Sequence, residues 1–288
     1  QSAWKKRDVL NASEYALMIN EGAINAGIAP KFSDPYSYGQ GTNWQDEVFN
    51  NNAPMMNHQV SVSGASEKVN YLFSLGFYTQ DGIVGGNFDR SNYERLTLRS
   101  NTQYTLFDES KERNWLNSLK VTSNLSYARI KSTNFDDNST WGTPLGSALA
   151  LSPILNVYDE TEEAIKAQFD KYGTTAEYTP VYDPRNGKLF SIPGEFGEMS
   201  NPIAKLSLPG DKHWSHKFVA NFSAELQLWD NLKFKTSYGA DLSFWGYDGY
   251  RPLYYLRSGE SSTQSSAYSR KEDGTVWQLE NVLMYDKS

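Results

Sequence analysis

Long runs in which polar and apolar residues alternate strictly constrain this chain more than any other feature. In LKFKTSYGADLSF (232–244), apolar residues alternate with lysine, serine and aspartate. Successive side chains of a strand point to opposite faces, so this run predicts a β-strand with one apolar and one wet face. The same pattern recurs in NYLFSLGFY (70–78), YERLTLRSNTQYTLF (93–107), LKVTSNLSY (119–127) and FVANFSAELQLW (218–229).

The predicted strands are unusually long. The runs above have 9 to 15 residues, whereas strands of globular proteins most often have about 5 to 6. A strand that crosses a bilayer at a tilt of roughly 45° needs about 9 to 11 residues. Aromatic residues make up 14% of the chain and gather near strand ends, as at Tyr104, Phe107, Phe244 and Trp245. That placement is typical of the aromatic girdles of membrane β-barrels.

The connections between the predicted strands also differ in length. Three are short or moderate, namely GASEK (64–68), DESKERN (108–114) and WDN (229–231). Between them lie longer segments at 83–91, 132–212 and 246–274. Short turns at one end and long loops at the other are characteristic of outer-membrane barrels. A soluble β-sandwich more often mixes loop lengths at both ends.

Alternation by itself fits any two-faced antiparallel sheet, including a soluble one. In lipid, however, every backbone polar group must be paired, so only a closed barrel can use such strands. About seven strands are predicted here, which cannot close a bacterial barrel of even strand number. We therefore expect an all-β fold, a partial transmembrane antiparallel β-barrel whose remaining strands lie outside this sequence. A soluble β-rich fold is the alternative.

One helix is predicted, at residues 12–26. Asn11 and Glu14 form a capping-box pattern before an apolar stripe of helical spacing, and Gly27 and Pro30 end it. No run approaches the 18 apolar residues of a transmembrane helix. The opening QSAWKKRDVL lacks the apolar run of a signal peptide.

Composition and motifs argue against several classes of function. The net charge of −7 disfavours nucleic-acid binding. The absence of cysteine excludes a disulfide scaffold, a thiolate zinc site and a cysteine nucleophile. His213 and His216 are three residues apart, which on a strand places them on opposite faces and disfavours a shared metal. We predict no catalytic site, no metal and no cofactor, and hence no enzyme.

Several segments in succession resemble the SusC/RagA-type TonB-dependent outer membrane receptors of Bacteroidetes. They are NASEYALMINE, GTNWQDEVFNNNAPMMNHQVSVSGASEKVNY, GFYTQDGIV, YERLTLRSN and NPIAKL. The resemblance covers nearly the whole chain. The most specific piece runs from Asn43 through Pro54 to Gly64. Ala65 departs from the family pattern, in which a second glycine is usual.

The resemblance implies a barrel of about 22 strands, closed by an N-terminal plug that this sequence does not contain. It implies the outer membrane of a Gram-negative bacterium as the location, with outer membrane lipid around the barrel. The implied partners are a SusD-like surface lipoprotein and TonB, which would act through the missing N-terminal part. The implied activity is import of oligosaccharides or peptides.

The resemblance and the strand pattern together divide the chain into expected segments. These are an extracellular loop with the helix (1–57), four barrel strands (58–131), a long extracellular loop (132–212), two strands (213–245), another extracellular loop (246–274) and a last strand (275–288).

Two sets of residues are candidates for contact with ligand or with the barrel interior. Aromatic residues in or beside the long connections can stack on sugar rings or peptide side chains, or can pack the loops and the lid interface; they are Trp141, Tyr158, Trp214, Trp245, Tyr247, Tyr250, Tyr254 and Tyr255. Residues on the polar side of the strands are expected to face the lumen; they are Arg95, Arg99, Asn101, Gln103, Lys120, Asn124, Glu225, Lys233, Lys235 and Asp241.

The leading functional hypothesis is therefore a nutrient import receptor. A soluble or surface-anchored β-rich glycan-binding protein is the alternative. A secreted glycoside hydrolase is a third possibility, weakened because no persuasive pair of acids is present.

Overall fold

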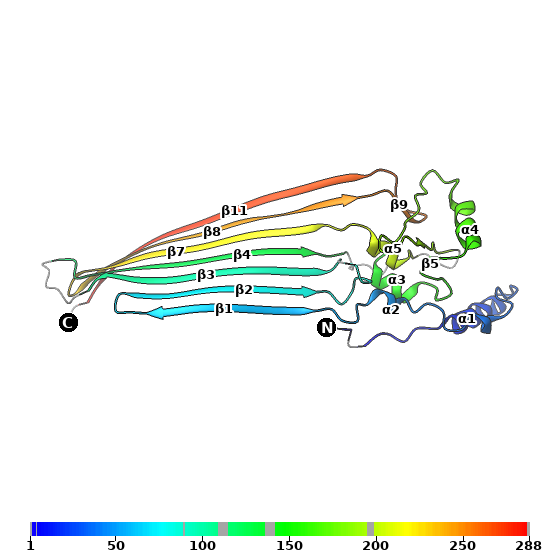
Figure 1. The fold of residues 1–288 in the computed structure, drawn as a ribbon, viewed down its shortest axis with the longest axis horizontal. Helices are drawn as coiled ribbons and strands as arrows, with labels where there is room; N and C mark the ends of the chain where they lie inside the picture. The colour runs from blue at the N-terminus through cyan, green and yellow to red at the C-terminus, as the bar shows by residue number, and fades with distance from the viewer. Residues whose placement is uncertain are drawn as a thin grey trace.

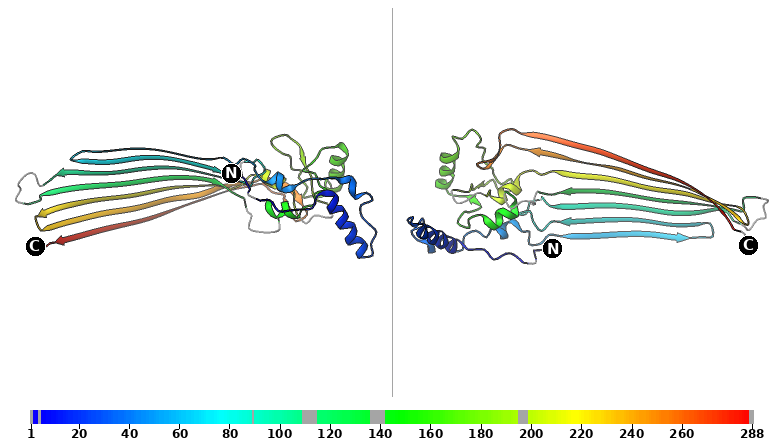
Figure 2. Two further views of the ribbon diagram at one scale, coloured as in Figure 1. Left: turned by 90° about the horizontal axis from the view of Figure 1, so that it is seen from below. Right: turned by 180° about the vertical axis from the view of Figure 1, so that it is seen from behind.

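The computed structural model describes residues 2–3, 5–88, 90–108, 115–135, 142–194 and 199–286. The molecule is elongated: a sheet of long strands carries a smaller group of helices and short strands at one end (Figure 1). We call that group the cap, its end of the sheet the cap end, and the opposite end the turn end. Within the described residues, the sheet is a single gently curved layer (Figure 2).

The sheet has seven antiparallel strands, as the alternation predicts. Their order is β1-β2-β3-β4-β7-β8-β11, so each strand pairs with the strand of the sheet that follows it in the sequence. Their bounds are Met55–Ala65 (β1), Val69–Asp81 (β2), Asn92–Phe107 (β3), Ser118–Thr133 (β4), Lys212–Trp229 (β7), Leu232–Arg251 (β8) and Ser266–Tyr285 (β11). The order leaves β1 and β11 at the edges.

Two strands extend further toward the cap than the alternation indicates. β8 continues to Arg251 and β11 begins at Ser266, so the expected loop 246–274 is reduced to residues 252–265. Pairs such as Tyr247 with Arg270 continue the ladder there. Polar residues occupy both faces of this part, which removes the alternation signal although the backbone pairing persists. The shortened connection forms the hairpin Tyr254–Arg257 (β9) and Glu260–Ser262 (β10).

The cap contains the expected helix, Ala12–Asn25 (α1), with its capping box formed by Asn11 and Glu14. It also holds elements that the sequence analysis did not predict, all of them short. These are Pro35–Tyr38 (η1), Trp44–Val48 (α2), Pro144–Ala150 (α3), Tyr158–Asp159 (β5), Glu162–Tyr172 (α4), Leu189–Phe190 (β6) and Pro202–Ser207 (α5). Side chains of Asn43, Thr143, Thr161 and Asn201 cap four of these helices.

The compact apolar core of the described residues lies in the cap, not on the sheet. Its members are Trp44, Val48, Val84, Ala148, Leu151, Phe190, Met199, Ile203, Ala204, Leu206 and Leu256. Trp44 also donates its indole N–H to the carbonyl of Ser152 at 3.0 Å. The apolar residues of the strands remain exposed, as Val60 (65%) and Phe73 (50%) show. No helix in the described ranges is long and apolar enough to span a membrane.

Candidate functional site

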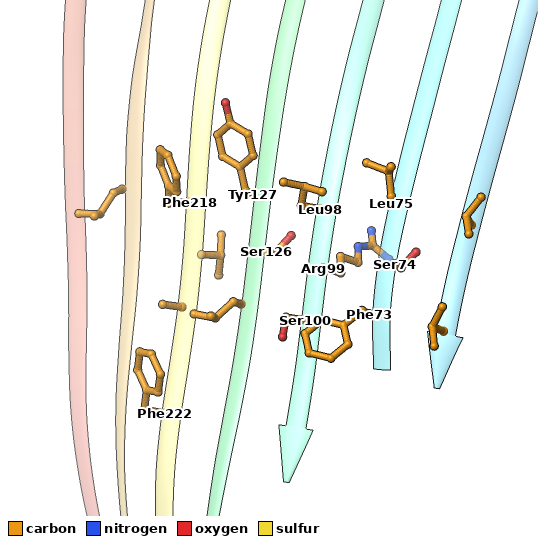
Figure 3. Close-up of a pocket in the computed structure, with 16 residues that line it drawn as sticks. Phe73, Ser74, Leu75, Leu98, Arg99, Ser100, Ser126, Tyr127, Phe218 and Phe222 are labelled. Carbon is orange, nitrogen blue, oxygen red and sulfur yellow. The ribbon is translucent and has the colours of Figure 1, made fainter. Parts of the chain in front are cut away.

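The register of the sheet sorts its side chains onto two chemically different faces. Directly paired residues lie on the same side, and one such row reads Val60, Leu75, Leu98, Tyr127, Phe218 and Leu242. We call this side the apolar face. A shallow groove of about 710 Å³ runs along it, lined by residues of five neighbouring strands together with Leu242 of β8 (Figure 3).

The height of the apolar face matches the interior of a membrane. On β8 the apolar face extends from Phe234 to Phe244, and these ten residue steps span about 34 Å at about 3.4 Å each. At a tilt of roughly 45° this corresponds to about 24 Å of thickness, close to the apolar band of about 25 Å in outer-membrane barrels. The dimension is therefore what a bilayer-spanning sheet requires.

The opposite side, here the polar face, carries all ten residues that the sequence analysis assigned to the lumen. Asn101, Asn124 and Asn221 stand side by side across three strands. Lys120, Glu225 and Lys235 form a second row in which the charge alternates in sign. Lys217 and Asp241 form an ion pair at 2.9 Å. Because these groups share one face, the structure brings the set together, although their lumenal role stays a prediction.

Aromatic rings line the cap end of the polar face. Tyr247 lies 5.5 Å from the ring of His213 and 6.2 Å from that of Tyr268. Trp245 occupies the same face two residues earlier on β8. Across the sheet, the guanidinium of Arg95 lies 5.7 Å from the ring centre of Tyr78. Rings and a cation placed this way can contact sugars or peptide side chains by stacking.

A polar pocket of about 510 Å³ lies where the sheet meets the cap. Tyr250 and Tyr254 line it together with residues that the sequence analysis did not single out: Arg90, Lys205, Asp211, Arg251 and Tyr268. The phenol of Tyr268 donates to a carboxylate oxygen of Asp211 at 2.7 Å. A Cβ at Gly249 would collide with the Tyr268 ring, so this glycine makes the arrangement possible.

Arg90 is the most unusual group of this pocket. Burial lowers the pKa of its guanidinium, and the neighbouring Asp211 carboxylate acts in the opposite direction. Its Nε has no hydrogen-bond partner among the described residues. A Cβ at Gly210 would overlap the guanidinium, so a larger residue there would displace it. The pocket therefore presents a cation to any group that enters.

The remaining aromatic candidates are scattered. Tyr158 stacks on Phe190 at 5.1 Å and donates to Asp183 at 2.6 Å inside the cap. Tyr255 is buried (5% exposed) against other tyrosines of the cap. Trp214 lies on the apolar face, next to His216. Trp141 lies outside the described residues. The seven candidates within the described residues therefore do not form one cluster, and for Tyr158 and Tyr255 the structure shows packing contacts.

Sequence reasoning missed Arg90, Asp211 and Tyr268 because no local pattern marks them. They come from a connection, a strand entry and a strand that are far apart in the chain and meet only in the folded molecule. The two histidines of β7 lie on opposite faces, as the spacing predicts. Among the described residues, no group of three or more potential metal ligands is present.

A single-layer sheet of long strands, with one apolar face of membrane height and one polar face, is the kind of sheet that forms the wall of an antiparallel β-barrel. No family model matches the chain. It is 27% identical to the TonB-dependent receptor SusC of Bacteroides thetaiotaomicron over 78% of this chain and 20% of that protein. It is 25% identical to TonB-dependent receptor P3 of Formosa agariphila over 98% of this chain and 24% of that protein.

Solved structures show the same fold. A chain of the RagAB peptide transporter aligns with a TM-score of 0.64 at 17% identity, over 98% of this chain and 30% of its own length. The RagAB peptide importer in the closed-closed state aligns with a TM-score of 0.61 at 19% identity, over 99% of this chain and 28% of its own. These comparisons confirm the resemblance to part of a SusC/RagA-type receptor. The chain spans about a quarter or less of its curated relatives.

Proposed function

We propose that this chain forms part of the barrel wall of a TonB-dependent import receptor in the outer membrane of a Gram-negative bacterium. The observation that carries the proposal is the two-faced sheet, whose apolar face is about as high as a membrane interior. The apolar face contacts lipid and the polar face lines the lumen. The curated relatives, which are named as TonB-dependent receptors, support this assignment.

The proposal also orients the sheet. The cap end faces the cell exterior and the turn end the periplasm, because outer-membrane barrels have long loops outside and short turns inside. Segments 1–54 and 134–211, and the shortened connection 252–265, then form the extracellular loops. The cap built from these segments has its own apolar core, so it holds a defined shape above the membrane.

Substrate and partners follow from the same assignment. We infer that the parent receptor imports oligosaccharides or peptides together with a SusD-like lipoprotein, and that TonB acts through a part of the receptor beyond this sequence. The residues best placed for ligand contact are Trp245 and Tyr247 on the polar face and Tyr250 and Tyr254 in the pocket below the cap. Their rings supply stacking surfaces, and Arg90 supplies a positive charge nearby.

Single-cysteine labelling in the full-length receptor tests the two-faced arrangement. The chain contains no cysteine, and with any cysteine elsewhere in the receptor replaced by serine each label reports one position. Leu125→Cys lies on the apolar face and Asn124→Cys, its neighbour, on the polar face. With a fluorescent thiol label in vesicles, we expect brominated lipid to quench the label at 125 and an aqueous quencher to act on the label at 124. Equal aqueous quenching at both positions would instead indicate a soluble sheet.

A further inference from the structure

Cationic side chains interrupt the apolar face just above the groove, toward the cap end. They are Arg129 and Lys131, which follow Tyr127 on β4, and Lys212, which precedes Phe218 on β7; His216 lies between Lys212 and Phe218. In the register, Arg129 lies opposite His216 and Lys131 lies opposite Trp214. All belong to the side of the sheet that carries the apolar groove. The cations begin one side-chain step, about 7 Å, beyond the rim of the groove.

The acids around this cluster lie beside its lysines and not beside Arg129. On the same side, the neighbouring strands bring four acids: Glu94 opposite Lys131, Asp248 opposite Lys212, and the more distant Asp81 and Asp273. Arg129 has Leu96 and His216 as its cross-strand neighbours and no acid. Within the described ranges, no salt bridge involves Arg129, Lys131 or Lys212. Arg129 is therefore the cation of this cluster most open to an external anion, whereas Lys131 and Lys212 each face one acid across the strand pairing.

An aromatic column joins the groove to the cations. The ring of Tyr127 lies 4.6 Å from that of Phe218, and its hydroxyl lies 2.8 Å from Nδ1 of His216. Trp214 continues the column, with its ring centre 5.8 Å from His216. Figure 3 shows the Tyr127 hydroxyl directed away from the groove, toward the cap end. Rings with an apolar body and a polar tip are suited to the boundary between hydrocarbon and headgroups.

The groove itself has room for hydrocarbon. Large side chains such as Leu98, Phe218 and Phe222 form its walls, and the small residues Ser100 and Ala220 lie between them. Its volume of about 710 Å³ falls in the range of sites that hold small organic ligands. An apolar groove, an aromatic boundary and a cluster of cations thus follow one another along β4 and β7.

We propose that this side of the sheet is a binding site for an anionic, phosphate-bearing lipid of the outer leaflet. Arg129, Lys131 and Lys212 hold the phosphate, and an acyl chain lies in the groove. Guanidinium groups bind phosphate oxygens in pairs, which gives Arg129 the leading role. The inference rests on the proposed placement in the membrane, because only then do the apolar groove and the cations lie at the depth of acyl chains and headgroups.

The test uses the full-length receptor in nanodiscs of phosphatidylcholine with a minor fraction of phosphatidylglycerol as the anionic probe. Native mass spectrometry measures which lipid stays bound after the nanodisc is released. We expect the wild type to retain phosphatidylglycerol preferentially. The double variant Arg129→Gln/Lys131→Gln is expected to lose that retention at least about tenfold, since each cation near a membrane surface contributes about 1 kcal/mol.

Two further variants separate the possible causes. Arg95→Gln/Lys235→Gln removes two cations from the polar face, both outside the groove, and should leave retention unchanged. Ala220→Trp fills the groove without changing charge and should also reduce retention. Equal retention of both lipids by the wild type, or an unaltered preference in Arg129→Gln/Lys131→Gln, would overturn the lipid site. Failure of the receptor to enter nanodiscs as a folded protein would instead count against the proposed function on which the site rests.

Discussion

At the scale of single residues, the best-defined interaction in the described structure is the network around Asp183. Its carboxylate is fully buried and accepts hydrogen bonds from Arg185 at 2.7 Å and from Tyr158 at 2.6 Å. Arg185 also donates to the carbonyl of Gly86 at 2.9 Å and stacks over the ring of Phe88 at 3.7 Å. The network therefore ties the turn at 183–187 to a connection almost a hundred residues earlier in the chain.

Replacing Asp183 with asparagine is expected to destabilise the cap by about 2 kcal/mol. The substitution removes a charge that pairs with Arg185 and weakens hydrogen bonds that satisfy buried groups. Hydrogen exchange of the cap in the full-length receptor measures the effect. Asp170→Asn, at an exposed position of α4, serves as the control and should leave exchange unchanged. Equal exchange in both variants would show that the network contributes little.

The same carboxylate predicts how the cap responds to acid. Burial alone would raise the pKa of Asp183, but the hydrogen bonds from Arg185 and Tyr158 outweigh it and lower the pKa to about 2. The unfolded value is about 3.9. A depressed folded pKa contributes stability that is complete above about pH 5 and is lost as the pH falls from about 4 through 2. The free energy of opening of the cap, taken from exchange rates corrected for their intrinsic pH dependence, should fall between pH 5 and 2 in the wild type and change less in Asp183→Asn.

At the scale of elements, helix α1 depends on its first turn. The Asn11 side chain accepts from the Glu14 N–H at 2.9 Å, and the Glu14 carboxylate accepts from the Asn11 N–H at 2.9 Å. Asn11→Ala removes one of these two hydrogen bonds and should destabilise helix α1 by about 1 kcal/mol. We expect faster hydrogen exchange across residues 12–25, whereas Glu21→Ala at an exposed site in the same helix should have no such effect. Unchanged exchange in Asn11→Ala would mean that packing, not capping, sets the stability of α1.

The central strand β4 permits a direct comparison of the two faces. Leu125 pairs with Ala220, which itself pairs with Ala240 midway along the apolar band of β8. An arginine at such a lipid-facing position costs about 2 to 4 kcal/mol, whereas lumenal substitutions are tolerated. Leu125→Arg should therefore lower the yield of heat-modifiable folded receptor, and Asn124→Arg should not. Similar losses in both variants would contradict the assignment of the faces.

At the scale of the whole molecule, the cap and the sheet are stabilised by different means. The cap has a buried apolar core, while the sheet relies on backbone pairing between long strands and, in the proposed setting, on lipid around its apolar face. Phe190, 2% exposed, is one of the largest side chains of the cap core. Unfolding of the cap should therefore leave the sheet largely intact.

Phe190→Ala tests this independence. Truncating a buried phenylalanine typically costs about 3 to 5 kcal/mol. In the full-length receptor we expect hydrogen exchange to increase throughout the cap while protection of β1 to β4 stays near the wild-type level. Tyr36→Ala, at a position 74% exposed, is the control. A joint loss of protection in cap and strands would show that the two halves unfold together.

The amino-acid sequence by itself determined the seven strands, their two faces, and helix α1 with the capping box at its N-terminus. These features are local: alternation with a period of two sets the faces, and a side chain three residues away sets the helix start. The segment that most resembles SusC/RagA-type receptors also has a local structural role. The Asn43 side chain caps the N-terminus of α2, and Trp44 packs in the apolar core of the cap.

Only the tertiary structure decided how far the strands run, what the long connections build and which residues meet. β8 and β11 extend past the apolar band, where both faces are wet and alternation carries no information. The pocket of Arg90, Asp211 and Tyr268, and the bond between Asp183 and Arg185 that reaches Gly86, join segments distant in the chain. The cations above the groove become a cluster only through the pairing of β4 with β7, which are separated by the whole of segment 134–211. Proximity of this kind depends on strand order and register, which no local pattern encodes.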